Sequence, residues 1–312
     1  MKVRKLGRTG LDVSVIGIGT WQFGGEWGMD FTQGQVNAIL DQAKDVGINL
    51  IDTAECYGDH LSEELIGGYL ASGSSSRGDW IIATKFGHHF TGHLERSQQW
   101  QPEQVLKQLE DSLTALRTDY IDLYQFHSGS DEQFDNDALW TLLDKQVQAG
   151  KIRHLGISIG SNDNVHQTDA ATKVGAGAIQ VVYNRLDRKP EERVFASCER
   201  QNLGVLARVP LASGYLSGKY KPGAKFEAND VRYRHDEQYK SDVLRTVEQI
   251  GRDEVPAGVP MAEWALAWCL QHPAVTSVIP GCKSPEQVRS NAAAAELALV
   301  SDEHPQAVAV QK

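Results

Sequence analysis

Four polar residues follow short apolar runs of the chain and could together protonate a carbonyl oxygen. They are Asp52 at the end of INLID, Tyr57 just beyond it, Lys85 at the end of WIIATK and His127 at the end of YIDLYQFH. The carboxyl ends of neighbouring parallel strands meet at one face of a barrel, so we expect these side chains to converge there. Core packing gives no reason for polar groups at these positions.

The residue types suit proton donation. A tyrosine donates its proton near neutral pH when its phenolate is stabilised, and a nearby ammonium would do this by lowering the tyrosine pKa. Lys85 is the candidate ammonium, and Asp52 would pair with it so that it keeps its charge in the barrel mouth. His127 would donate to the substrate oxygen or orient it. Taken singly, Asp52 would be a structural carboxylate and Tyr57 a packed ring.

Eight apolar runs alternate with segments of helical spacing and would position these residues. The runs are VIGIG, NLID, WIIATK, YIDLYQFH, IRHLGIS, AIQVVYN, GVLARVP and VTSVIPG. Parallel strands joined by right-handed crossovers close most simply into an α/β (β/α)8 TIM barrel. Such a barrel takes about 250 residues plus loops, so residues 1–312 would form a single domain. An open doubly wound sheet is disfavoured, because GIGTWQFGG lacks the GxGxxG spacing.

Segments outside the alternating pattern predict further features. KVRKL and LDVS flank 7–10 and indicate an N-terminal β-hairpin under the barrel. The long stretches HHFTGHLERSQQWQ and SGYLSGKYKPGAKFEANDVRYRHDEQY are expected as loops at the C-terminal face that shape a pocket. Pro102 and Ser284 indicate helix starts, and Trp264 and Trp268 lie four apart on a helix expected to pack against the barrel.

The bulk composition excludes several classes of partner. A net charge of -10 argues against nucleic acid and against acidic membrane surfaces, although a small anionic cofactor is still allowed. No apolar run approaches the roughly 18 residues of a membrane span, and MKVRKLGRTGLDVS does not resemble a signal peptide. We therefore expect a cytoplasmic protein.

The cysteines and histidines give no sign of a metal site in the sequence. Cys56, Cys198, Cys269 and Cys282 form no CxxC pair, which predicts reduced, buried thiols. The histidines of HHFTGH at 88–93 lack a carboxylate or cysteine at helical spacing that would complete a metal shell. We expect no metal. Cys56 and Cys282 flank the proposed site, and we hypothesise that their oxidation impairs activity.

The segments GINLIDTAECYGDHLSEELIG, IIATKFG and DYIDLYQFH resemble the aspartate, tyrosine, lysine and histidine tetrad of the aldo-keto reductase family. The resemblance continues through LGIS, AIQVVYN, RVPLASGYLSGKY and IPGCKSPEQVRSN and covers almost the whole chain. It points to the bacterial branch, which is also similar to potassium-channel β-subunits. It implies reduction of aldehydes or ketones to alcohols by hydride transfer from NADPH, with Tyr57 as the general acid.

The same resemblance implies a set of cofactor contacts. At the nicotinamide and pyrophosphate the matching residues are Thr20, Trp21, Ser158, Gln180, Arg208, Pro210, Leu211, Ser213, Lys219 and Arg232. Around the 2′-phosphate, ribose and adenine they are Gly281, Cys282, Lys283, Gln287 and Asn291. SPEQ starts a helix whose free N–H groups would face that phosphate. A lysine there favours NADPH over NADH.

Several alternatives stay open. A channel β-subunit-like protein would bind the cofactor as a sensor with low turnover, and a barrel lyase or isomerase would use Lys85 as a Schiff-base amine. Trp27 and Trp100 would either line the substrate opening or pack the upper loops down. The natural substrate is not fixed by the sequence, and monomers, dimers and larger rings are all compatible with it.

Overall fold

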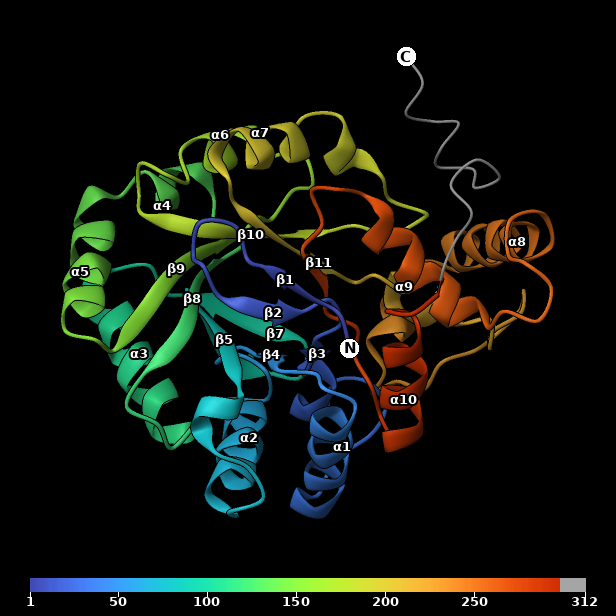
Figure 1. Cartoon of the computed structure of the whole chain (residues 1–312), viewed down its shortest axis with the longest axis horizontal. Coiled ribbons are helices and arrows are strands. Elements are labelled where there is room, and N and C mark those ends of the chain that lie inside the picture. The colour runs from blue at the N-terminus through green and yellow to red at the C-terminus, as the bar shows by residue number, and fades with distance from the viewer. Residues whose placement is uncertain (298–312) are drawn as a thin grey trace.

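Eight parallel strands form a closed barrel in the computed structural model, which describes residues 1–297 (Figure 1). They are β3 (Ile18–Gly19), β4 (Leu50–Asp52), β5 (Ile81–Phe86), β8 (Ile121–His127), β9 (Ile152–Ser158), β10 (Ala176–Val182), β11 (Gly204–Arg208) and β12 (Ser277–Val278), paired in that order. Parallel bridges from Ile16 to Val278 and from Gly19 to Gly281 join the last strand to the first. The predicted (β/α)8 barrel and its eight runs are confirmed.

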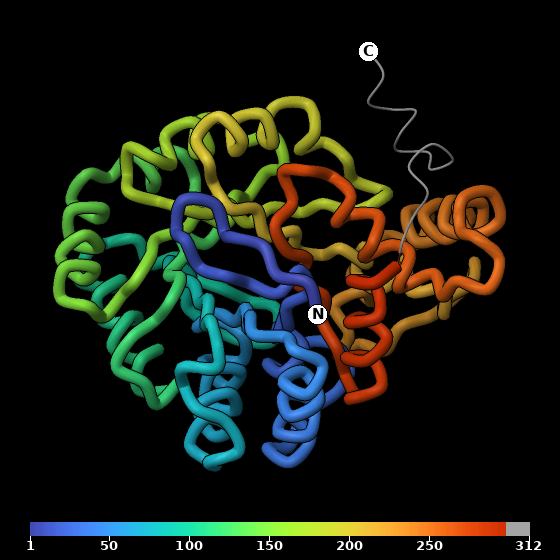
Figure 2. The backbone as a smooth tube through the Cα atoms, in the orientation of Figure 1, coloured from blue at the N-terminus to red at the C-terminus, as the bar shows by residue number. Residues whose placement is uncertain are grey.

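Helices surround the strands in a ring (Figure 2). The main ones are α1 (Gln33–Asp45), α2 (Leu61–Ala71), α3 (Pro102–Ala115), α5 (Asp137–Gln148), α6 (Val165–Asp169), α7 (Val194–Gln201), α9 (Met261–Gln271) and α10 (Pro285–Ala293). The additional helices α4 (Asp131–Phe134) and α8 (Glu237–Asp253) lie in the connections, and α8 lies at the edge of the ring beyond α9. Each barrel strand is thus followed by a helix that covers it.

Local sequence signals set several helix starts. Pro102 lies in the first turn of α3, where its missing N–H costs nothing. The Ser284 side chain accepts a hydrogen bond from the Gln287 N–H and caps α10. Thr32 and Gln35 form a capping box at α1. The predicted helix starts at Pro102 and Ser284 are confirmed.

A β-hairpin closes the bottom of the barrel. Its strands β1 (Val3–Lys5) and β2 (Asp12–Ser14) pair antiparallel, as predicted. The Asn49 side chain accepts from the Ser14 N–H at 2.8 Å and donates to the Asp12 carbonyl at 2.8 Å. Residues of the hairpin and of the barrel strands form one apolar cluster, made of Leu6, Val13, Leu50, Ala83, Leu123, Ala178, Leu206 and Ile279. This layer seals the barrel below the polar residues.

The two long stretches at the upper face are more ordered than expected. The prediction of a loop after the third strand is wrong, because residues 88–98 form the antiparallel strands β6 (His88–Gly92) and β7 (Glu95–Gln98). These strands are polar on both faces, so they lack the alternation that marks a strand in sequence. The second stretch contains the 3-10 helices η4 (Ala212–Ser217) and η5 (Val231–Arg234) before α8 begins. Three further short 3-10 helices are η1 (Trp21–Gly24), η2 (Arg77–Asp79) and η3 (Lys189–Glu191).

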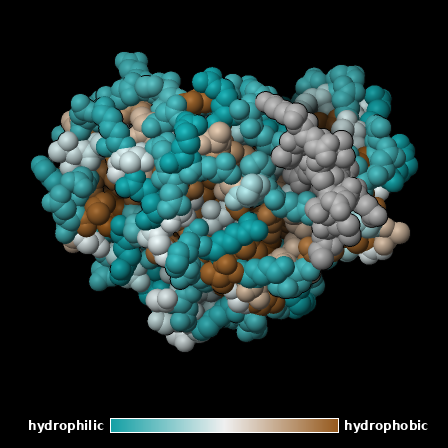
Figure 3. All heavy atoms as spheres, turned by 45° about the horizontal axis from the view of Figure 1, so that its top comes forward, coloured by the Kyte–Doolittle hydropathy of each residue, from teal (hydrophilic) through white to brown (hydrophobic). Residues whose placement is uncertain are grey.

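The main core lies between the strands and the helix ring. Trp264 and Trp268 on α9 are fully buried there, which confirms their packing role. All four cysteines are free and buried, as predicted. The face seen in Figure 3 is mainly hydrophilic, with scattered hydrophobic residues. Within residues 1–297, no helix combines the length and apolar character that a membrane crossing requires.

Candidate active site

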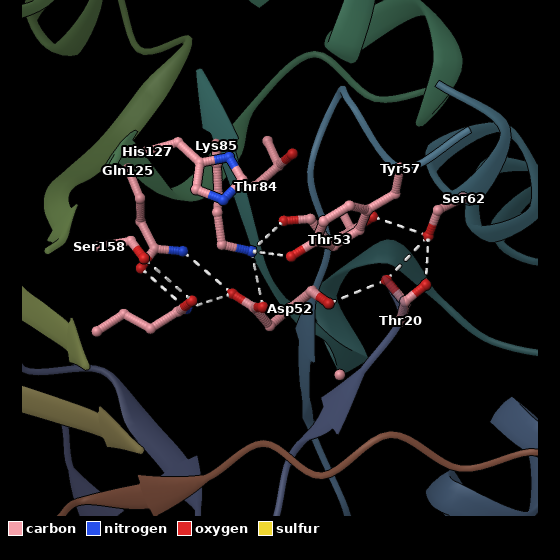
Figure 4. A network of polar contacts seen from close by, with 12 residues as sticks. Thr20, Asp52, Thr53, Tyr57, Ser62, Thr84, Lys85, Gln125, His127 and Ser158 are labelled. Carbon is pink, nitrogen blue, oxygen red and sulfur yellow. Dashed lines mark hydrogen bonds and ion pairs between the residues drawn. The ribbon is translucent and has the colours of Figure 1, made fainter. Parts of the chain in front are cut away.

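The structure brings the four predicted polar residues together at the carboxyl ends of three neighbouring strands. Asp52 ends β4, Lys85 lies near the end of β5, and His127 ends β8. Tyr57 lies in the turn between β4 and α2. Figure 4 shows their side chains around the Lys85 ammonium. The convergence expected from strand ends is therefore present.

Lys85 is the centre of this cluster. Its Nζ donates to Asp52 Oδ2 at 2.8 Å, to the Thr53 carbonyl at 2.7 Å and to Tyr57 Oη at 3.3 Å. The Lys85 side chain is fully buried. Burial alone would lower the pKa of Lys85, but the charge of Asp52 and the contact with Tyr57 outweigh it and raise the pKa. The amine is therefore a permanent cation beside the phenol.

The Tyr57 phenol stays protonated over a wide pH range. Burial raises its pKa to about 12, and the Lys85 charge acts in the opposite direction. The expected effect of Lys85 is present, but it does not dominate, so the net shift is upward. A protonated phenol beside a fixed cation can give up its proton when the phenolate that forms is held by Lys85.

His127 offers a neutral ring to the same space. Burial and then the Lys85 charge lower the pKa of His127 well below its ordinary value. Its ring stands edge-on to the Tyr57 ring, with 6.3 Å between centroids. A neutral imidazole has one donor and one acceptor nitrogen, so it can orient a carbonyl oxygen without adding charge.

Two glutamine amides hold the second oxygen of Asp52. Gln180 Nε2 donates to Asp52 Oδ1 at 2.7 Å, and Gln125 Nε2 donates to the same oxygen at 3.1 Å. Sequence reasoning missed Gln125. The sequence QFH could have revealed it. Residues two apart on a strand point to the same face, so Gln125 points to the same face as His127.

Gln180 and Ser158 lie together at the wall expected to meet the nicotinamide. Ser158 Oγ is 3.4 Å from Gln180 Oε1, and Ser158 is fully buried behind it. Gln180 faces the cavity next to the tetrad, whereas neither Ser158 nor Lys85 is among the cavity-lining residues. The Gln180 amide nitrogen donates to Asp52 and to Gln125 Oε1, whereas its carbonyl oxygen accepts one hydrogen bond, from Ser158, and can accept a second from a ligand.

A cavity of about 650 Å³ opens above the cluster and runs along the ends of β11 and β12. Fourteen of the fifteen residues expected at a cofactor line it: Thr20, Trp21, Gln180, Arg208, Pro210, Leu211, Ser213, Lys219, Arg232, Gly281, Cys282, Lys283, Gln287 and Asn291. Asp52, Tyr57 and His127 line the same cavity. One space therefore connects the tetrad with the segment before α10.

The cavity presents hydrogen-bond donors and positive charge along its length, from Arg208 at the end of β11 to Asn291 on α10. Arg208 Nε and Asn291 Nδ2 are buried and have no hydrogen-bond partner within residues 1–297. Arg232 is held in a bidentate pair by Asp230, at 2.8 and 2.6 Å, which fixes its guanidinium over the space. Unpaired buried donors are costly, and an anionic ligand with acceptor atoms would satisfy them. This wall fits a phosphate-bearing cofactor.

Ser213 and Val209 show how the backbone shapes that wall. Both have positive φ, 57° for Ser213 and 54° for Val209, and both line the cavity. A β-branched residue in this region is strained, and such strain persists where the surrounding structure enforces it. Asn184 Nδ2 donates to the Val209 carbonyl at 3.0 Å and helps to hold the turn.

The first turn of α10 also faces the cavity. Lys283 precedes it and donates through its backbone N–H to Gln287 Oε1 at 2.8 Å. The Lys283 ammonium contacts the Trp27 carbonyl across the channel. The free N–H groups and partial positive charge of a helix start favour an anion at this place.

A sequence model of the aldo/keto reductase family matches residues 15–312. This chain belongs to the aldo/keto reductase family. It is similar to the uncharacterized oxidoreductase YqkF of Bacillus subtilis (strain 168), with 34% identity covering 97% of this chain and 94% of that protein. It is 31% identical to an aldo-keto reductase of Schizosaccharomyces pombe, yakc, whose name includes NADP(+), over 84% of this chain and 78% of the relative.

The chain is also similar to solved structures of the family and to potassium channel β-subunits. The holo form of aldo-keto reductase AKR11C1 from Bacillus halodurans superposes with a TM-score of 0.82 at 30% identity, covering 100% of this chain and 97% of the other. A probable voltage-gated potassium channel subunit beta of Arabidopsis thaliana is 27% identical over 95% of this chain and 92% of its own. The similarity to both bacterial reductases and channel β-subunits agrees with the branch predicted from sequence.

In this aldo/keto reductase the β6–β7 hairpin contributes to one wall of the cavity. Leu94 and Arg96 of the hairpin line the cavity, and the buried Glu26 holds both. Glu26 accepts from the Leu94 N–H at 2.8 Å and from Arg96 Nη2 at 2.6 Å, and the Trp21 indole N–H donates to it at 2.6 Å. Sequence reasoning missed Glu26 and Arg96, because no local sequence pattern predicts a contact between residues that are seventy positions apart.

The tryptophans and histidines of this reductase divide between lining and packing. Trp27 lines the cavity, whereas Trp100 packs against Phe126 with 4.5 Å between ring centroids, and it does not line the cavity. His88 lines the cavity, and its Nε2 contacts the His127 carbonyl at 2.6 Å. Of the two roles expected for these tryptophans, Trp27 therefore lines the opening and Trp100 packs the upper loops.

Proposed function

We propose that this aldo/keto reductase is a single-domain, NADPH-dependent enzyme that reduces aldehydes or ketones to alcohols, with Tyr57 as the general acid. One observation carries the proposal. The Lys85 ammonium lies between Asp52 Oδ2 and Tyr57 Oη, at 2.8 and 3.3 Å, and the tyrosine faces a cavity that also fits a phosphate-bearing cofactor.

Each residue of the tetrad has a distinct task in this proposal. NADPH, when bound, supplies the hydride that reaches the carbonyl carbon. Tyr57 donates its proton to the carbonyl oxygen, and Lys85 stabilises the phenolate left behind. Asp52 keeps Lys85 charged, while Gln125 and Gln180 fix the orientation of Asp52.

His127 and the aromatic walls position the carbonyl. The neutral His127 ring lines the cavity next to Tyr57, where one of its nitrogens would hydrogen-bond the substrate oxygen. Trp21 stacks over the Tyr57 ring at 6.0 Å between centroids and narrows the approach. A small or flat carbonyl group therefore suits this part of the cavity.

Preference for NADPH over NADH is supported by the charge around α10. Lys283 and Arg232 line the part of the cavity where the resemblance places the 2′-phosphate and pyrophosphate. Burial and then the Arg232 charge lower the pKa of Lys283, and the opposing effect of Asp230 is smaller, so a bound phosphate would stabilise the ammonium. The name of the yakc relative, which includes NADP(+), agrees with this preference.

The test is steady-state oxidation of NADPH with a panel of reactive aldehydes and ketones. We expect Tyr57→Phe to lower kcat/KM by about a hundredfold or more, since it removes the proton donor but keeps the ring. Tyr239→Phe, at an exposed position on α8, is the matched control and should leave turnover unchanged. Full activity of Tyr57→Phe would show that another group is the acid.

A cofactor-sensing protein is the second candidate, supported by the similarity to the Arabidopsis channel subunit. Such a protein would retain NADPH through purification and turn over slowly with every carbonyl of the panel. A reductase would exchange the cofactor and show saturable turnover with at least one of them. Single-turnover and steady-state rates measured on the same preparation separate these two functions.

A further inference from the structure

Three metal-binding side chains meet on the substrate side of the cavity. They are Glu55 and Cys56, in the turn after β4, and His127 at the end of β8. One ligand atom from each lies within 4.8 Å of the other two. Cys56 Sγ and His127 Nδ1 are 3.9 Å apart. Cys56 and His127 also line the cavity.

Glu55 is the observation that points to a ligand. Its side chain is 3% exposed, and Oε1 accepts from the His88 N–H at 3.0 Å. The second oxygen, Oε2, is buried and has no hydrogen-bond partner within the part of the chain that the structure describes. An unpaired buried carboxylate oxygen is costly. Either a proton or a cation must offset this cost.

We propose that Glu55, Cys56 and His127 form a binding site for one Zn²⁺ ion, with the fourth coordination position open to the cavity. A thiolate, an imidazole and a carboxylate are the ligand types that Zn²⁺ takes, whereas Ca²⁺ and Mg²⁺ prefer oxygen alone. Metal–ligand bonds of about 2.0–2.3 Å in a tetrahedron separate the ligand atoms by roughly 3.5 Å. Small side-chain rotations therefore bring the three atoms into range.

The surrounding charges permit a cation. The Lys85 charge is balanced by Asp52 at 2.8 Å, and Arg96, which also contacts the Cys56 thiol, is balanced by Glu26 at 2.6 Å. On binding, Zn²⁺ replaces the thiol proton of Cys56 and the carboxyl proton of Glu55, both of which pass to solvent. His127 binds through the lone pair of its neutral ring, and no electron is transferred.

The consequence for activity rests on the proposed function. A metal bound to His127 takes away the ring that orients the carbonyl oxygen, and its open position lies next to Tyr57. Zn²⁺ should therefore inhibit reduction, in competition with the carbonyl substrate. Metal binding itself does not depend on the reductase assignment, so it is measured separately.

Co²⁺ is the probe, because thiolate ligation gives it a charge-transfer band in the near ultraviolet. We expect the purified full-length protein to develop this band with one equivalent of Co²⁺, and Zn²⁺ to displace it. Cys56→Ser should abolish the band, and Glu55→Gln should weaken Co²⁺ binding by about tenfold or more. Cys198→Ser, which removes a buried cysteine on α7 outside the cluster, is the matched control and should keep the band.

Two further measurements keep the proposal falsifiable. Tyr57→Phe should retain the band even though it loses reductase activity, so failure of the proposed function would not be mistaken for failure of the metal site. Anomalous diffraction from Zn²⁺-soaked crystals of the unaltered protein should place the ion between the three side chains, which guards against variants that do not fold. Absence of the band, its persistence in folded Cys56→Ser, or an ion located elsewhere would overturn the site.

Discussion

The two ends of the barrel differ in what they bury: apolar side chains at the bottom and charged side chains at the top. At the bottom, Leu6 and Val13 of the hairpin meet a layer of apolar side chains. At the top, Asp52 and Lys85 are charged and almost completely buried, and Arg208 Nε has no hydrogen-bond partner among the described residues. At the bottom, protein side chains alone fill the barrel. At the top, a buried donor such as Arg208 Nε would find its hydrogen-bond partner only in a ligand. Substitutions at the bottom should therefore lower stability alone, whereas substitutions at the top should also change activity or cofactor binding.

The largest loss of stability is expected for Lys85→Met, at the upper end of the barrel. It leaves Asp52 as a buried carboxylate without its counter-charge, which should cost about 3–5 kcal/mol of unfolding free energy. Denaturant unfolding measures this, and the reductase rate should fall at the same time. In the double variant with Asp52→Asn the stability loss should be smaller than the sum of the single losses. Additive losses would mean that the two groups do not interact.

Leu6→Ala tests the bottom. Leu6 is fully buried in the apolar layer, so its truncation should cost about 2–5 kcal/mol through lost burial and the cavity left behind. The kcat/KM of the folded variant, assayed well below its unfolding temperature, should equal that of the parent protein. A large fall in kcat/KM without loss of stability would show that the hairpin influences the chemistry.

Lys283→Met tests the proposed 2′-phosphate site at the upper end of the barrel. We expect the Kd for NADPH to rise about tenfold, or about 1.4 kcal/mol, with little change for NADH, since only NADPH has the 2′-phosphate. Fluorescence titration with both nucleotides measures this. Lys219→Met is the matched control, because a lysine at the pyrophosphate should affect both nucleotides alike.

The smallest effect is a pH dependence at Asp230. Burial raises the pKa of Asp230, but the hydrogen bonds from Arg232 outweigh it and leave the pKa below its ordinary value. The pair therefore contributes stability above the ordinary aspartate pKa of about 3.9, and this is lost as pH falls through the folded-state pKa. In Asp230→Asn the amide oxygen can still accept from Arg232, so the unfolding free energy should fall by only about 1 kcal/mol at pH 7. The difference from the parent protein should close below about pH 4, and a constant difference would contradict the pairing.

The sequence predicted the barrel and the tetrad because both depend on strand ends. Eight apolar runs fix the strand number, and a residue such as Lys85 at the end of its run is placed at the upper face by topology alone. Contacts between distant segments were not predictable in this way. The hold of Glu26 on Arg96 and the second hydrogen bond on Asp52 from Gln125 depend on how loops and side chains pack.

The pKa values and hydrogen-bond partners of the site residues were likewise not predictable from the sequence. The position of Tyr57 beside Lys85 was predicted, but the net direction of the Tyr57 pKa was not, because burial of the phenol outweighs the neighbouring charge. Gln180 was expected to hydrogen-bond a ligand with its amide, yet its nitrogen binds Asp52. The type of a residue follows from sequence, while its degree of burial and its partners follow only from the packed structure.

The bridge between Gly19 and Gly281 makes the barrel seam a contact between residues near opposite ends of the chain. During synthesis the edge of β3 has no partner on that side until the last strand leaves the ribosome. An unpaired strand edge can join other chains, and at 5–20 residues per second this exposure lasts roughly ten seconds or more. Early packing of the first strands against their own helices would shorten this exposure.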